Sequence, residues 1–126
     1  MKKLLLFLLV LLTAIACSGD DMNPNAVYIR LSNISNYDYK NINVNTSTGG
    51  VMFDDLDAQT TSEYKVFEQA YRYAFVELEI EGNTYTIQPI DYVGETPLSN
   101  GQYTYQINAN EPNGQYGTLS LNLVKD

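Results

Sequence analysis

The chain has 126 residues, and its 15 acidic side chains outnumber its 7 basic ones, which gives a formal net charge of −8 at pH 7. This balance argues against nucleic acid as a partner, because phosphate binding requires clustered lysine and arginine. The sequence contains no histidine and a single cysteine. Metal sites built on imidazole or several thiolates are therefore excluded, as are the Ser-His-Asp and Cys-His catalytic systems.

The first 16 residues have the order of parts found in a secretory signal peptide. Lys2 and Lys3 precede an apolar run from Leu4 to Leu12, and the small residues Ala14 and Ala16 follow. The 13 residues from Leu4 to Ala16 are fewer than the roughly 18–20 that a membrane-spanning helix needs. We therefore expect a signal peptide at residues 1–16 that is cleaved, rather than a permanent membrane helix.

The only cysteine, Cys17, directly follows this segment. Ala14-Ile15-Ala16-Cys17 resembles the lipobox of bacterial lipoproteins, although that family favours leucine at the position of Ala14. The resemblance implies that Cys17 is diacylated on sulfur and becomes the new N-terminus. Two acyl chains, at about 0.8 kcal/mol per buried methylene, hold a protein stably in a membrane. The alternative is a buried free thiol or half of a disulfide, for which the chain offers no intramolecular partner.

Ser18, Gly19, Asp20 and Asp21 come next. They resemble the acidic sorting signal that directs lipoproteins of Bacteroidetes-type bacteria to the outer face of the outer membrane. The resemblance implies a small surface lipoprotein, with a periplasm-facing anchor as the alternative and residues 17–25 as a flexible acidic tether. Cleavage would remove Lys2 and Lys3 and leave 5 basic residues against 15 acidic ones. Such an acidic surface keeps a displayed domain soluble and does not attract anionic lipid.

Residues 26–126 show period-2 alternation of apolar and polar side chains, which predicts β-strands. Val27, Ile29 and Leu31 are one such set. No sustained helical period occurs, and residues 67–75 are the only place for a helical turn. We predict a single all-β domain, an antiparallel β-sandwich of about seven or eight strands with an immunoglobulin-like or transthyretin-like topology. The expected strands cover residues 27–32, 41–45, 51–53, 62–67, 76–81, 84–88, 103–108 and 118–123, with a turn at 111–114.

A hairpin is predicted at the sequence FVELEIEGNTYTIQ. If Gly82-Asn83 is a two-residue loop, Ile80 faces Tyr85 and Leu78 faces Ile87. This register places the apolar residues of both strands on one face. The carboxylates of Glu77, Glu79 and Glu81 then lie on the opposite face.

These three glutamates are the candidates for carboxylate chemistry. Successive Cα atoms would lie roughly 6–7 Å apart along the strand, and paired carboxylates can hydrolyse glycosides. A solvent-facing strand kept polar by charge explains them better, so no catalytic residue is assigned. Asp54, Asp55 and Asp57 crowd one loop and are candidate calcium ligands. Their spacing is not that of an EF-hand, and an acidic turn is the favoured explanation.

Tyrosine is the unusual feature of the composition, with eleven residues. The pairs at 37 and 39, 71 and 73, and 103 and 105 are each two residues apart, so each pair shares one face of a strand. Tyrosine is a good strand former, and we expect most of these side chains in the core. Polar loop residues surround Tyr37 and Tyr39, which makes this pair the candidate for contact with a partner.

The expected function is that of a non-enzymatic, membrane-anchored module that binds a protein or a glycan and needs no cofactor. A structural subunit that adds an edge strand to a surface complex is the alternative. A small carboxylate-dependent hydrolase is the third possibility.

Overall fold

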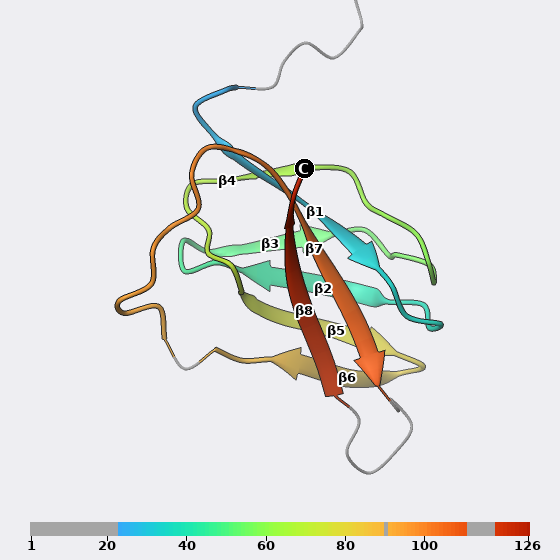
Figure 1. Ribbon diagram of the computed structural model, residues 1–126. Coiled ribbons are helices and arrows are strands. Elements are labelled where there is room, and N and C mark those ends of the chain that lie inside the picture. Colours follow the sequence, from blue (N-terminus) through green and yellow to red (C-terminus); the bar gives the residue numbers. More distant parts are fainter. Residues whose placement is uncertain (1–22, 90, 111–117) are drawn as a thin grey trace, which may run out of the picture.

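The computed structural model describes residues 23–89, 91–110 and 118–126, and all regular secondary structure within them is β-strand (Figure 1). Two four-stranded sheets pack face to face, which confirms the predicted all-β sandwich. The strands are β1 (Val27–Asn33), β2 (Lys40–Asn45), β3 (Gly50–Phe53), β4 (Lys65–Phe67), β5 (Phe75–Ile80), β6 (Asn83–Ile87), β7 (Gly101–Asn110) and β8 (Thr118–Lys125).

The strand orders are β4-β1-β7-β8 in one sheet and β3-β2-β5-β6 in the other. All pairs are antiparallel except β1 and β7, which run parallel from Val27 opposite Gly101 to Asn33 opposite Ile107. We expected antiparallel pairing throughout. Parallel neighbours need a long crossover connection. The chain between β1 and β7 provides it, with β2, β3, β5 and β6 in the other sheet and β4 at the edge of this one.

The core lies between the two sheets and follows the predicted alternation. Along β1 the residues are alternately buried and half-buried, with Val27, Ile29 and Leu31 inside. Across the sandwich, β2 and β5 contribute Ile42, Val44, Val76, Leu78 and Ile80, all fully buried. Burial of such side chains is worth about 1.5–3 kcal/mol each and is the main source of stability.

The fourth strand is shorter than predicted. Only Lys65–Phe67 pairs regularly with β1, whereas residues 60–62 contact β1 through an isolated bridge and two backbone hydrogen bonds. Ser62 takes the place of a ladder residue, because its hydroxyl accepts a hydrogen bond from the Leu31 amide at 2.9 Å. Residues 67–75 contain bends and no helical turn. In the described part of the chain, no helix is long and apolar enough to cross a membrane.

The β5–β6 hairpin has the predicted faces but a different register. Ile80 pairs with Asn83 and Leu78 with Tyr85, so the two loop residues are Glu81 and Gly82. The prediction of Gly82-Asn83 as the loop is therefore wrong, and the predicted pairing of the two strands is displaced by two residues. Both Glu81 (φ 51°) and Gly82 (φ 83°) have positive φ, as a type I′ turn requires, and glycine takes its usual second place. A shift of two keeps every side chain on its face, which is why alternation alone permitted it.

The two ends of the sandwich differ in what they carry. Residues 23–26 enter at the upper left of Figure 1, and β1 then crosses to the right-hand end. The loop of residues 34–39 and the β5–β6 turn meet at that right-hand end, because Lys40 at the start of β2 pairs with Glu79 near the end of β5.

Candidate ligand-binding pocket

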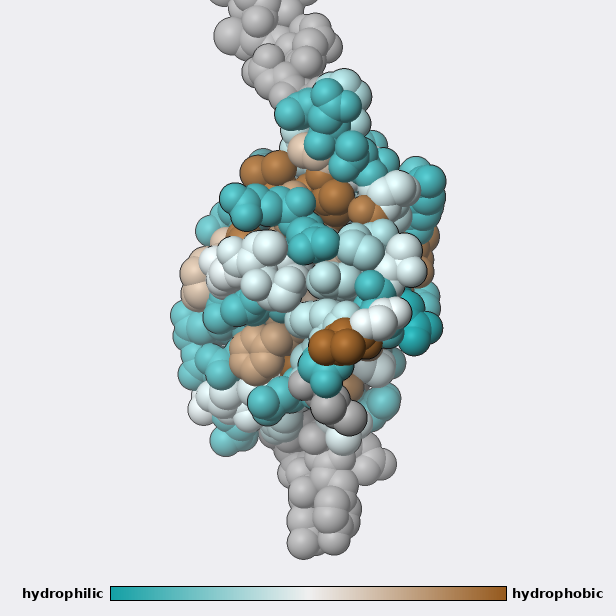
Figure 2. Space-filling model, turned by 90° about the vertical axis from the view of Figure 1, so that its left-hand side faces the viewer, coloured by the Kyte–Doolittle hydropathy of each residue, from teal (hydrophilic) through white to brown (hydrophobic). Residues whose placement is uncertain are grey.

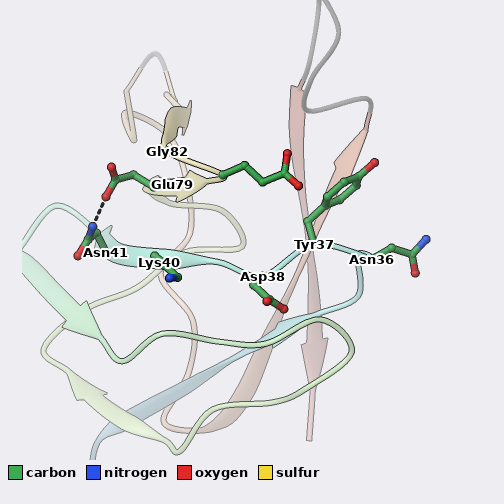
Figure 3. A pocket seen from close by; sticks show the side chains of 8 residues that line it. Asn36, Tyr37, Asp38, Lys40, Asn41, Glu79 and Gly82 are labelled. Carbon is green, nitrogen blue, oxygen red and sulfur yellow. Dashed lines mark hydrogen bonds between the residues drawn. The ribbon is translucent and has the colours of Figure 1, made fainter.

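A hollow of about 520 Å³, lined mostly by polar and charged residues, lies where the 34–39 loop meets the β5–β6 turn (Figure 3). This volume is within the roughly 300–1,000 Å³ range of small-molecule sites. Three segments line it, with residues Asn36, Tyr37, Asp38, Lys40, Asn41, Glu79, Glu81 and Gly82. In Figure 3, Tyr37 lies on one side and the Asn41–Glu79 pair on the other.

A β-bulge in β2 brings Lys40 to this hollow. Asn43 pairs with Glu77, but Lys40 pairs with Glu79, so three residues of β2 span two residues of β5. In a regular ladder Lys40 would share the face of the buried Ile42. The extra residue turns Lys40 to the outer face, where it is exposed. Bulges re-aim side chains in this way beside binding sites.

Asn41 is the residue on which the bulge depends. Its φ is 51°, a left-handed conformation that asparagine tolerates better than most residues. Its amide nitrogen donates a hydrogen bond to Asp55 Oδ1 at 3.2 Å. Its side-chain Nδ2 donates to the Glu79 carboxylate, the bond drawn as a dashed line in Figure 3. Two contacts thus fix the orientation of Asn41 and Glu79 in the hollow.

A buried asparagine shapes the loop that supplies Tyr37 and Asp38. Asn33 is 1% exposed, and its Nδ2 donates to the carbonyl oxygens of Tyr37 at 2.6 Å and Leu56 at 3.1 Å. Its Oδ1 accepts from the amide and the hydroxyl of Ser35, at 2.9 and 2.7 Å. One side chain therefore makes four hydrogen bonds, so the loop is held before any ligand arrives.

The two tyrosines proposed for partner contact lie in different environments. Tyr39 is 1% exposed, and its hydroxyl donates to the Ile107 carbonyl of the facing sheet at 2.9 Å. Burial raises the pKa of Tyr39. Tyr39 is thus a core residue, and its assignment to a partner surface was wrong. Tyr37 is half-buried and lines the hollow, and no described residue forms a hydrogen bond with its hydroxyl.

Both signs of charge occur in the lining. Asp38, Glu79 and Glu81 contribute carboxylates, and Lys40 is the cation among the lining residues. Within the described ranges Lys40 forms no ion pair, since the two pairs found join Arg30 to Asp126 and Arg72 to Glu95. Residues of both signs of charge therefore line the same hollow, and the Asp38 carboxylate also accepts a hydrogen bond from the Ala58 amide at 2.9 Å.

Of the three candidate glutamates, the structure brings two to the hollow. Glu79 and Glu81 line it, whereas Glu77 is exposed on the same strand outside it. Glu79 already accepts the hydrogen bond from Asn41.

The three loop aspartates do not converge. Asp54 and Asp55 line a separate hollow of about 250 Å³, and Asp57 does not. Asp55 accepts from the Asn41 amide, while the Asp57 carbonyl accepts from the Thr60 amide and hydroxyl. Among the residues with described positions, no three His, Cys, Asp or Glu side chains are placed to hold a metal ion. The structure therefore does not support a calcium site at these aspartates.

The remaining tyrosine pairs serve mainly structure. Tyr103 and Tyr105 are buried, as expected. Tyr92 stacks on Tyr71 with ring centroids 4.5 Å apart and on Tyr73 at 5.5 Å, which fastens the loop before β7. The left-hand side of the molecule, seen in Figure 2, is mainly teal and white with separate brown areas, so it offers no broad apolar docking face. Cys17 and the Ser18, Gly19, Asp20, Asp21 segment lie outside the described residues.

Reasoning from the sequence missed Lys40, Asn41, Asn36 and Asp38 as members of one site. The signal available in the sequence was the lysine at position 40, which has the parity of buried Ile42 and Val44. A lysine at an inward position indicates either a strand end or a bulge.

No known protein family matches the chain, and no functionally curated protein matches it either. One solved structure, described as the NMR structure of the protein from Eubacterium rectale, is similar in fold. It has 17% sequence identity and a TM-score of 0.57 over 82% of this chain and 94% of that one. At this level of identity the similarity supports the sandwich fold alone.

Proposed function

We propose that this protein is a lipid-anchored binding module of the bacterial outer membrane, displayed on the cell surface. The observation that carries the proposal is the position of Cys17, the only cysteine, directly after a short apolar segment that ends in small residues. Lipid on Cys17 would give the acidic domain a stable hold on the membrane. The acidic Ser18-Gly19-Asp20-Asp21 segment supports the outer face, and a periplasm-facing anchor is the alternative.

The placement of the hollow is consistent with this role. The chain reaches β1 from the N-terminal side, and the 34–39 loop follows the end of the same strand. Seven strand residues at about 3.3 Å each separate the two ends by roughly 20 Å. The hollow would then lie at the end of the sandwich away from the tether, where a ligand outside the membrane is accessible.

A non-enzymatic role agrees best with the residues in the hollow. Without histidine or a second cysteine, catalysis would depend on carboxylates, and Glu79 is engaged by Asn41. The alternative, a subunit that adds a strand to a larger complex, needs a long free sheet edge. The edges at β3 and β4 are only 4 and 3 residues long, whereas β8, at the other edge of its sheet, is 8 residues long and is where such strand addition would occur.

Cell fractionation of the wild type and of Cys17→Ser tests the proposal. The wild-type protein should sediment with the outer membrane and be digested when protease is added to intact cells. Cys17→Ser should appear in the soluble fraction with the same domain stability. Full protection of the wild type on intact cells, with digestion after lysis, would contradict surface display.

A pull-down from detergent-solubilised membranes separates the two leading functions. A free-standing module should purify without stoichiometric membrane proteins. A membrane protein that co-purifies in equal amount would instead support the subunit.

A further inference from the structure

We propose that the hollow between the 34–39 loop and the β5–β6 turn binds a neutral saccharide. This inference rests on the proposed binding function and names the class of ligand. It starts from the charged residues Lys40, Asp38 and Glu79, which line one hollow of about 520 Å³.

The mixture of charges disfavours ligands of a single sign. An anion placed against Lys40 would also meet the carboxylates of Asp38 and Glu79, and like charges at short range repel. A cation placed against those carboxylates would meet the ammonium of Lys40. A ligand without net charge avoids both conflicts.

Hydroxyl groups satisfy such a lining best. A carboxylate only accepts hydrogen bonds and an ammonium only donates them, whereas a hydroxyl does both. Asn41 adds a side-chain oxygen that can accept, since its Nδ2 already donates to Glu79. A molecule with several hydroxyls can therefore donate hydrogen bonds to Glu79 and accept them from Lys40 in one pose, as a sugar ring can.

Tyr37 supplies the apolar part of the site. Its ring is half-buried at the side of the hollow opposite the Asn41–Glu79 pair (Figure 3). Aromatic rings offer a large flat face at little conformational cost, and the C–H face of a sugar ring can pack against it. Asn33 holds the Tyr37 carbonyl, so the ring is presented by a fixed loop.

The test is an NMR titration of the purified domain, residues 18–126, with its amide resonances assigned. The probes are neutral di- and trisaccharides of glucose, galactose and mannose, followed by free amino acids, spermidine and inorganic phosphate. A neutral saccharide should shift the amides of Tyr37, Lys40 and Glu79, whereas the amino acids, spermidine and phosphate should not.

Matched variants identify the contacts. Tyr37→Ala and Lys40→Gln should each weaken saccharide binding by about tenfold, the loss expected for one good contact. Tyr37→Phe should retain binding within about threefold because the ring remains. Glu77→Gln, on the same strand outside the hollow, should match the wild type, and dispersed spectra verify that every variant is folded.

The inference is overturned if no saccharide in the panel shifts these amides at millimolar concentration. It is also overturned if only amino acids, spermidine or phosphate do so. Either result leaves the membrane-anchored binding function standing, since cell fractionation tests that function separately.

Discussion

Lys40 and Glu79 lie directly opposite each other across the β2–β5 ladder, although the next pair, Asn43 and Glu77, leaves one residue of β2 unmatched. That extra residue reverses the direction in which Lys40 points. With the bulge, Lys40 is exposed beside Glu79, while Ile42 stays in the core. The hollow therefore depends on a local irregularity in one strand.

Asn41 should tolerate glycine and reject a β-branched residue. Glycine adopts a φ of 51° without strain, so Asn41→Gly should lose only the Glu79 contact and about 1 kcal/mol or less. Asn41→Val should lower the free energy of unfolding by about 1–3 kcal/mol, because valine is strained in this conformation. Urea denaturation measures both. A valine variant as stable as the glycine variant would contradict the bulge geometry.

Asn33→Ala should be among the more damaging polar substitutions. It would leave the Tyr37 carbonyl and the Ser35 hydroxyl without the partner that Asn33 provides. We expect a loss of about 2–4 kcal/mol in the free energy of unfolding. Asn36→Ala, at an exposed position in the same loop, is the matched control and should change stability by less than about 0.5 kcal/mol. Equal effects of the two substitutions would show that Asn33 does not organise the loop.

The alternation of side chains correctly predicted which face of each strand is buried, but not which residues pair between strands. Val27, Ile29 and Leu31 are buried as expected, because period-2 patterning reports which side of a strand is covered. The β5–β6 register was displaced by two positions, since a shift of two leaves that pattern unchanged. The parallel pairing of β1 with β7 joins residues more than seventy positions apart, as Tyr28 and Gln102 show, and no local signal encodes it.

The candidate site was predictable only in part. Tyr37 and the strand of glutamates were identified from their residue types. The burial of Tyr39 depends on Ile107, a residue far along the chain. The carbonyl of Ile107 accepts a hydrogen bond from the Tyr39 hydroxyl. Lys40 lies opposite Glu79 because of the bulge. In the alternation of side chains, the only sign of this bulge is a lysine at a position that should face the core.

The hairpin loop can be tested at Asn83. In the observed register Asn83 is the first residue of β6, so Asn83→Thr should be neutral or stabilising by a few tenths of a kcal/mol, as threonine favours strands. Gly82→Ala should destabilise by about 1 kcal/mol or more, because φ at Gly82 is +83°. Thermal unfolding compares the two variants. Marked destabilisation by Asn83→Thr would favour the Gly82-Asn83 loop instead.

Alkaline pH should unfold the protein through its buried tyrosines. Burial strongly raises the pKa of Tyr105, whose hydroxyl donates to the Tyr71 carbonyl at 2.6 Å, and burial also raises the pKa of Tyr39 and Tyr92. The unfolded chain then releases these protons first, near pH 10. Stability should thus be complete below pH 10 and fall as the pH rises above it.

Tyr105→Phe provides the control for this pH dependence. The variant should lose about 1 kcal/mol at neutral pH, because the Tyr71 carbonyl loses its hydrogen bond. Its stability should decline less steeply above pH 10 than that of the wild type. Urea denaturation at several pH values measures both effects, and the absorbance of tyrosinate reports how many tyrosines are ionised. An unchanged slope would show that Tyr105 does not contribute to the alkaline transition.

The most direct measurement for the proposed function is intact-mass and N-terminal peptide mass spectrometry of the protein purified from its native membrane. Lipidation at Cys17 predicts a chain that begins at Cys17 and carries the mass of attached fatty acyl chains. A chain with an unmodified thiol at Cys17, or one that retains residues 1–16, would contradict it.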